Sequence, residues 1–116
     1  MKKNVIKEKS FEFALNIVQL NQFLISEKRE YVLSKQVLRS GTSIGALVRE
    51  SEHAESKKDF IHKLSISLKE ANETDYWLEI LFRSSFIEEE IYLKLKNSIL
   101  EILRILTSII KTSKIV

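Results

Sequence analysis

Four long segments of the chain carry apolar residues at intervals of three and four, and no proline interrupts any of them. The 116 residues include no proline and only two glycines, whereas average usage would give about 6 prolines and about 8 glycines. These two residue types supply most turns and corners of sheet proteins. The pattern therefore predicts an all-α fold, an up-down-up-down antiparallel four-helix bundle that occupies residues 1–116 as one domain.

Local signals place the ends of these helices. Ser10 is the expected N-cap of the first, and Ser56 with Asp59 matches a variant capping box at the start of the third. Charged residues, rather than glycine or proline, form the connections. The expected helices span, in order, Ser10–Ser26, Ser34–Ala54, Ser56–Arg83 and Ile87–Thr112.

Two of the segments carry more apolar surface than a bundle core needs. The third segment has one seam, at Phe60, Leu64, Ser67, Ala71, Thr74, Leu78 and Leu81. The first has two adjoining stripes, which are Phe13, Ile17, Leu20 and Leu24 beside Phe11, Ala14, Val18 and Ile25. The fourth is widened in the same way by Ile91, Leu103 and Ile110. Because large exposed apolar patches usually mark interfaces, this surplus predicts self-association.

The two glycines, Gly41 and Gly45, lie four residues apart inside the second predicted helix. A glycine there costs about 1 kcal/mol relative to alanine. Close approach of a neighbouring backbone is the usual reason for accepting such a cost. We therefore expect a tight helix contact at these positions, and no phosphate-binding loop pattern accompanies them.

Charge and cysteine content exclude several classes of protein. The formal net charge is only +3, which permits nucleic-acid binding without indicating it. Without cysteine there is no disulfide framework, thiolate zinc site or thiol nucleophile. No window reaches the roughly 18 uncharged apolar residues of a membrane span. These features predict a cytoplasmic protein with no membrane segment.

The residues that would carry catalytic or metal chemistry are few. Glu50 precedes His53, and Asp59 precedes His62, each by three residues, as in the Glu-x-x-His repeats of di-iron bundles. Both pairs flank the same turn, so solvated helix-end residues are the preferred interpretation and a metal-dependent enzyme the alternative. The carboxylates Glu70, Glu73 and Asp75 have no base or nucleophile beside them in sequence. The sequence thus predicts no enzyme and no cofactor.

Polar residues of the second and third helices indicate a contact between them. Arg39, with Gln36, Ser40 and Ser43 around it, would pair with Glu50, Glu70 or Glu73 in the bundle or across a subunit boundary, or alternatively meet a phosphate. The adjacent rings of Tyr76 and Trp77 point about 100° apart on a helix, so one belongs to the core and the other to the surface or an interface.

Four stretches carry a family resemblance, namely Gln36–Ala46, Glu50, Ser56–Leu64 and Lys69–Leu78. Their order and spacing resemble the bacterial four-helix-bundle proteins related to those encoded in 23S ribosomal RNA intervening sequences. The pattern commonly has Asn where this chain has Leu47. Motif positions carried over from the resemblance are Gln36, Arg39, Ser40, Gly41, Ser43, Ile44, Gly45, Glu50, Phe60, Lys69, Glu70, Glu73, Tyr76 and Trp77.

The resemblance implies a bundle that assembles into a ring, pentameric in characterised relatives. It also implies kinship with the accessory protein of diversity-generating retroelements, which binds a reverse transcriptase and nucleic acid. The leading hypothesis is therefore a non-enzymatic homo-oligomer that acts as an interaction or scaffold module. The alternative is an accessory protein that binds RNA, DNA or a nucleic-acid enzyme through Lys2, Lys3, Lys7, Lys9, Lys57, Lys58 and Lys63.

Overall fold

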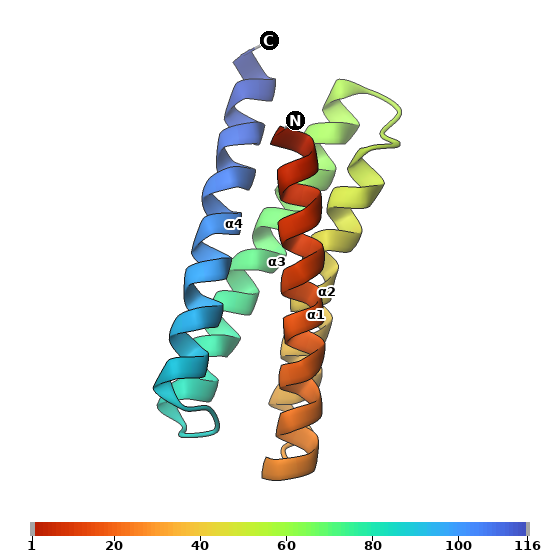
Figure 1. Cartoon of the computed structure of the whole chain (residues 1–116). Coiled ribbons are helices and arrows are strands. Elements are labelled where there is room, and N and C mark those ends of the chain that lie inside the picture. The colour runs from red at the N-terminus through yellow and green to blue at the C-terminus, as the bar shows by residue number, and fades with distance from the viewer. Residues whose placement is uncertain (1, 116) are drawn as a thin grey trace.

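The computed structural model describes residues 2–115, with side chains from Val5 onward. Its helices are α1 (Lys2–Lys28), α2 (Leu33–Ser51), α3 (Lys57–Arg83) and α4 (Glu89–Ile115). They alternate up and down in a bundle of 47 × 21 × 20 Å (Figure 1). The predicted all-α, antiparallel four-helix bundle is confirmed.

The helices form a four-cornered arrangement. Each of α1 and α3 packs against both α2 and α4, so α1 lies diagonally across the bundle from α3, and α2 from α4. One end of the bundle holds both chain termini and the α2–α3 turn, and the other end holds the α1–α2 and α3–α4 turns (Figure 1). The α1–α2 side and the α3–α4 side are therefore opposite sides of the molecule.

The core follows the predicted stripes closely. Six of the seven seam positions of α3 are buried, and Phe60 packs against them partly exposed. The stripe of α1 that faces this core is Phe13, Ile17, Leu20 and Leu24, each at most 5% exposed. The adjoining stripe is not covered within the chain, since Phe11, Val18 and Ile25 stay exposed.

The start of α1 differs from the prediction. Ser10 is not an N-cap: it lies well inside the helix, 1% exposed, and its hydroxyl donates to the Lys7 carbonyl at 3.2 Å. The reason is tertiary. Ile6, on the N-terminal side of Ser10, is buried and lines one small cavity with Val48 and Ile109. Burial of Ile6 therefore extends the packed part of α1 beyond Ser10 toward the N-terminus.

The other expected ends shift by a few residues. Helix α2 ends at Ser51 rather than Ala54, and α4 runs from Glu89 to Ile115 rather than from Ile87 to Thr112. Shifts of this size are usual at helix ends, which fray and close with different local hydrogen bonds. The capping box of α3 is confirmed: the Ser56 hydroxyl accepts the Asp59 N–H at 3.0 Å, and the Asp59 carboxylate accepts the Glu55 N–H at 3.2 Å.

Two turns use the left-handed region without glycine. Arg29 has φ 51° and Ser85 has φ 66°. Each follows a helix end, and the next N–H closes the turn: Glu30 donates to the Leu24 carbonyl and Phe86 to the Leu81 carbonyl. A helix commonly ends this way on a glycine, because side chains are strained there. These two turns therefore have the backbone geometry that usually favours glycine, although their sequences contain none.

Glu30 caps α2, a role that its place in a charged connection did not suggest. Its carboxylate accepts the backbone N–H groups of Val32, Leu33 and Ser34 at 3.2, 3.0 and 2.7 Å. Burial alone would raise the pKa of Glu30, but the hydrogen bonds from Leu33, Ser34 and Val32 outweigh it and lower the pKa below its ordinary value. Since Val32 at the N-cap position offers no side-chain cap, Glu30 satisfies the start of the helix.

Replacing Glu30 with Gln should destabilise the bundle by about 1 kcal/mol at neutral pH, the usual size of a cap. Because the pKa of Glu30 is lower in the folded state, its contribution is complete above the unfolded-state pKa of about 4.3 and disappears as the pH falls through the folded-state value. Urea unfolding at pH 7 and pH 3 measures the difference. Glu27→Gln, an exposed neighbour, is the matched control; equal losses at both pH values for Glu30→Gln would contradict the capping role.

Candidate functional site

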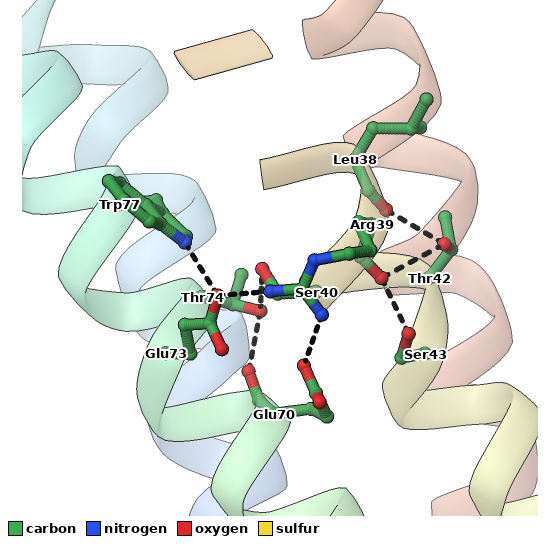
Figure 2. Close-up of polar contacts among 9 residues, drawn as sticks. All are labelled: Leu38, Arg39, Ser40, Thr42, Ser43, Glu70, Glu73, Thr74 and Trp77. Atoms are coloured by element: carbon green, nitrogen blue, oxygen red, sulfur yellow. Dashed lines mark hydrogen bonds and ion pairs between the residues drawn. The ribbon is translucent and has the colours of Figure 1, made fainter. Parts of the chain in front are cut away.

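The polar residues that the sequence places on α2 and α3 meet in one network. Arg39 of α2 contacts two carboxylates of α3, with Nη1 3.2 Å from Glu70 Oε1 and Nη2 against Glu73 Oε2 (Figure 2). The indole Nε1 of Trp77 donates to the same Glu73 oxygen at 3.0 Å. Of the three predicted partners of Arg39, Glu70 and Glu73 are therefore confirmed, whereas Glu50 pairs with Lys63 instead, at 3.2 Å.

This ion pair lies at the surface. The side chain of Arg39 is 49% exposed, and those of Glu70 and Glu73 are 21% and 36% exposed. Exposed pairs of this kind contribute about 0–1 kcal/mol because solvent screens them. The Arg39 guanidinium contacts two carboxylates one turn apart on α3, so it fixes the position of α2 along α3. This alignment matters more than the small contribution of the ion pair to the free energy of folding.

Buried hydroxyls lie beneath the ion pair. The hydroxyls of Thr74 and Ser40 are hydrogen-bonded to each other at 2.9 Å, and Thr74 Oγ1 also bonds to the Glu70 carbonyl oxygen at 2.7 Å (Figure 2). Two turns from Thr74 along α3, the Ser67 hydroxyl donates to the Ile44 carbonyl of α2 at 2.9 Å. Ser40, Ser67 and Thr74 are each 0% exposed. Among the described residues, every buried side-chain nitrogen and oxygen has a partner.

The chemistry available to this network is limited by those partners. The hydroxyls of Thr42 and Ser43 bond to carbonyls of their own helix, at Leu38 and Arg39. Each buried hydroxyl likewise bonds to a carbonyl or to another hydroxyl. Within residues 5–115, no histidine is hydrogen-bonded to any of these hydroxyls. A serine nucleophile needs a neighbouring base to take its proton. The hydrogen bonds that the structure shows for this network join α2 to α3.

The glycines of α2 lie in a tight helix contact, as predicted, and the partner helix, which the sequence did not identify, is α1. A Cβ atom on Gly41 would stand 2.9 Å from both Cγ1 and Cγ2 of the buried Ile17. A Cβ atom on Gly45 would stand 3.3 Å from the carbonyl oxygen and from the hydroxyl oxygen of Ser10. The first contact is with a side chain and the second with both backbone and side chain of Ser10, so the missing side chains let α1 and α2 approach closely.

The seven lysines proposed for nucleic acid do not share one surface role. Lys7 pairs with Glu52 at 3.2 Å, and Lys9 pairs with Glu101 at 3.3 Å. Lys63 is held by Glu50 as above. Lys57 and Lys58 are exposed in the first turn of α3 and form no ion pair with the described residues. The side chains of Lys2 and Lys3 lie outside the described residues.

The remaining motif positions are structural or exposed. Tyr76 is 59% exposed, whereas Trp77 packs against the core, and the two rings meet edge to face with centroids 5.2 Å apart. Leu47, at the position where the family commonly has Asn, is half-buried. Lys69 is exposed and Gln36 is half-buried. The predicted division of the Tyr–Trp pair between surface and core is confirmed.

The carboxylate–histidine pairs are not gathered into a metal site. His53 and His62 are exposed, Glu50 pairs with Lys63, and Asp59 caps α3. Among the residues that the structure describes, no cluster of three or more His, Asp or Glu side chains could hold a metal ion.

Reasoning from sequence also missed other contacts between helices, including the following two. Lys96 of α4 pairs with Asp75 of α3 at 2.6 Å, and this hydrogen bond raises the pKa of Lys96. The sequence offered one indication of this pair. Asp75 lies seven residues from both Leu68 and Phe82, so a carboxylate interrupts a row of apolar residues on α3. The guanidinium of Arg49 lies over the ring of Phe11, 5.0 Å from its centre, and no sequence pattern indicated it.

Comparisons with known proteins match nearly the whole chain. The family model described as 23S rRNA-intervening sequence protein matches residues 2–108. A crystal structure of a protein with unknown function from the S23 ribosomal protein family of Bacteroides thetaiotaomicron VPI-5482 is 58% identical. That likeness covers 96% of this chain and 99% of the other, with a TM-score of 0.94. No curated protein matches the chain. Within residues 2–115, no helix is long and apolar enough to cross a membrane.

Proposed function

The chain belongs to the family of 23S rRNA-intervening sequence proteins, and from that premise we propose that it is a non-enzymatic homo-oligomer serving as an interaction or scaffold module in the cytoplasm. The Bacteroides thetaiotaomicron protein, a solved relative, is itself of unknown function. The proposal therefore rests on this chain's own residues, above all on the apolar side chains that the bundle leaves uncovered.

The observation that carries the proposal is the exposed apolar surface of α1 and α4. Side chains that a monomer would leave in water are 36–50% exposed and lie on these two helices: Phe11, Leu15, Val18, Ile25, Ile91, Leu93 and Leu100. Monomeric proteins seldom expose contiguous apolar patches of this kind, whereas subunit interfaces do. The family resemblance implies a closed ring of five such subunits.

Sedimentation velocity over a range of concentrations tests self-association. At micromolar concentration the chain should sediment as a species larger than its 13.6 kDa mass, and dilution should move the boundary toward the monomer. A monomer throughout that range would contradict the proposal.

A second candidate function is that of an accessory protein for RNA or DNA. Lys57 and Lys58 favour it, because they are exposed and have no ion pair among the described residues. Both belong to the start of α3, and that end of the helix lies at the end of the bundle that also holds the start of α1 (Figure 1). A ring would repeat this pair once per subunit, which would multiply the modest charge of a single chain.

Fluorescence anisotropy with labelled RNA and DNA distinguishes the two candidates. Binding through phosphates should weaken steeply between about 50 and 200 mM salt, and more so when several lysines are engaged. The double substitution Lys57→Glu/Lys58→Glu should abolish it, while Lys69→Glu, an exposed lysine farther along α3, should change it little. Absence of binding even at low salt would remove this candidate and leave the first untouched.

A further inference from the structure

A hollow of about 200 Å³ lies between α1 and α4. Each helix contributes two apolar side chains to it, Leu20 and Phe23 from α1 and Ile91 and Leu95 from α4. Leu20 and Leu95 are buried, whereas Phe23 and Ile91 are exposed. The hollow therefore has an apolar interior that opens to solvent between two aromatic or aliphatic side chains.

The hollow lies where side chains do not tie α1 to α4. Nearer the chain termini, Lys9 of α1 pairs with Glu101 of α4 at 3.3 Å and closes the space between the helices. Toward the end that holds the α1–α2 and α3–α4 turns, the two helices diverge (Figure 1). The apolar side chains around Leu20 are thus left partly apart, and a space remains between them.

Three polar side chains also line the hollow, and they are uncommitted. Asn16 and Gln19 belong to α1 and Lys94 to α4, and none of them has a hydrogen bond or ion pair with the described residues. Asn16 is half-buried, and the other two are exposed. Lys94 therefore shares the hollow with two amides, whereas Lys9, also between α1 and α4, meets the carboxylate of Glu101.

This combination favours an amphipathic anion as the ligand. A carboxylate can accept from the ammonium group of Lys94 and from the amide N–H groups of Asn16 and Gln19. Glu90, one turn before Lys94, is exposed and forms no ion pair with it, so the ammonium group is available. Apolar walls with a few polar groups at the mouth are typical of sites for small molecules.

The volume limits the size of the ligand. A cavity of about 150 Å³ lined by leucine, isoleucine and phenylalanine accommodates benzene. At about 200 Å³, the hollow between α1 and α4 has room for one ring, or for an alkyl chain of similar volume, with a short link to a charged group at its mouth.

We propose that this hollow binds a small carboxylate whose body is a single ring or a short alkyl chain. The body lies between Leu20 and Leu95, and the carboxylate meets Lys94 at the mouth. Such a ligand goes beyond a scaffold role, because it supplies the missing anion between α1 and α4 and joins the two helices where their own side chains do not. The site lies within one chain and does not depend on self-association.

Three probes that share a ring and a chain and differ only in charge test the ligand class: phenylpropionate, phenylpropanol and phenylpropylamine. Each is titrated into the full chain, and methyl-labelled NMR spectroscopy follows the binding. Phenylpropionate should bind most tightly and phenylpropylamine least. The methyl resonances of Leu20, Ile91 and Leu95 should shift saturably, while those of Ile44, buried between α2 and α3, should not.

Two variants separate the charge from the apolar walls. Lys94→Gln should weaken phenylpropionate binding by about fivefold, as expected for loss of an exposed ion pair, and leave phenylpropanol binding unchanged. Ile91→Ser should weaken both probes alike, because it removes part of the apolar wall. Both positions are exposed, so folding should persist, and circular dichroism checks it. Lys111→Gln, an exposed lysine of α4 outside the hollow, is the matched control.

Several results would overturn the proposal. One is the absence of a saturable shift up to about 50 mM phenylpropionate, well above the millimolar Kd expected for a ligand of about eleven heavy atoms. Another is equal affinity for the three probes, or equal losses for phenylpropionate and phenylpropanol in Lys94→Gln. Shifts at Leu100 and Leu103 in place of those around the hollow would show adsorption on exposed apolar surface and would also contradict it. None of these results bears on self-association, which sedimentation tests separately.

Discussion

Gly41→Ala should destabilise the wild-type bundle and yet be neutral or stabilising once Ile17 is replaced by Ala. In the wild type the added methyl group would meet two Ile17 carbons at 2.9 Å, an overpacking that costs about 1–3 kcal/mol and exceeds the gain of about 1 kcal/mol in helix propensity. Ile17→Ala alone should cost about 2–5 kcal/mol as a cavity. In that background the two Cγ atoms are gone and only the Cβ atom of residue 17 remains close, at 3.3 Å, so most of the clash is relieved and the gain in propensity remains. Urea unfolding of the four proteins measures the cycle.

Gly45→Ala provides the control for this cycle. Its added methyl group would meet Ser10 rather than Ile17, so its effect on the free energy of unfolding should be the same in both backgrounds. If Gly41→Ala also had the same effect in both backgrounds, the close contact between α2 and Ile17 would not be what keeps a glycine at that position.

Thr74→Val should destabilise the bundle by about 1–3 kcal/mol, because it leaves the buried Ser40 hydroxyl without its partner from α3. Ser40→Ala should cost less, since Thr74 keeps its bond to the Glu70 carbonyl. In the Ser40→Ala background, Thr74→Val should lose most of its effect. Thermal or urea unfolding of the single and double variants gives the coupling energy.

Ser43→Ala is the control for the hydroxyl pair. Ser43 bonds to the Arg39 carbonyl within its own helix, so its loss should stay within about 0.5 kcal/mol and add to the other changes. Strictly additive effects of Ser40→Ala and Thr74→Val would show that the two hydroxyls do not act as a pair across the helix interface.

Periodicity was enough to predict the fold because the burial of a bundle residue follows from its place on the helix. The α3 seam from Leu64 to Leu81 is apolar or small at each step, so it could face only inward. The start of α1 could not be predicted in this way. Lys7, Glu8 and Lys9 suggest a polar end before Ser10, and only the packing of Ile6 against Val48 and Ile109 extends the helix through them.

The polar site was predictable in kind but not in detail. Arg39 required a carboxylate partner, and three were in reach by sequence; the heights of α2 and α3 decide that Glu70 and Glu73 are used. The Glu30 cap could not be predicted from the sequence, because Glu30 lies two residues before the N-cap residue Val32 and its carboxylate accepts N–H groups of the first turn of α2. The lysines show the same limit: whether Lys7 or Lys57 meets an acid depends on neighbours distant in sequence.

Native mass spectrometry of the wild-type chain tests the central claim, closed self-association, most directly. Closed self-association predicts one dominant species at a whole multiple of 13.6 kDa, five by family resemblance, with few intermediate sizes. A spectrum that contains only the monomer, or an open-ended ladder of sizes without a dominant closed species, would contradict it.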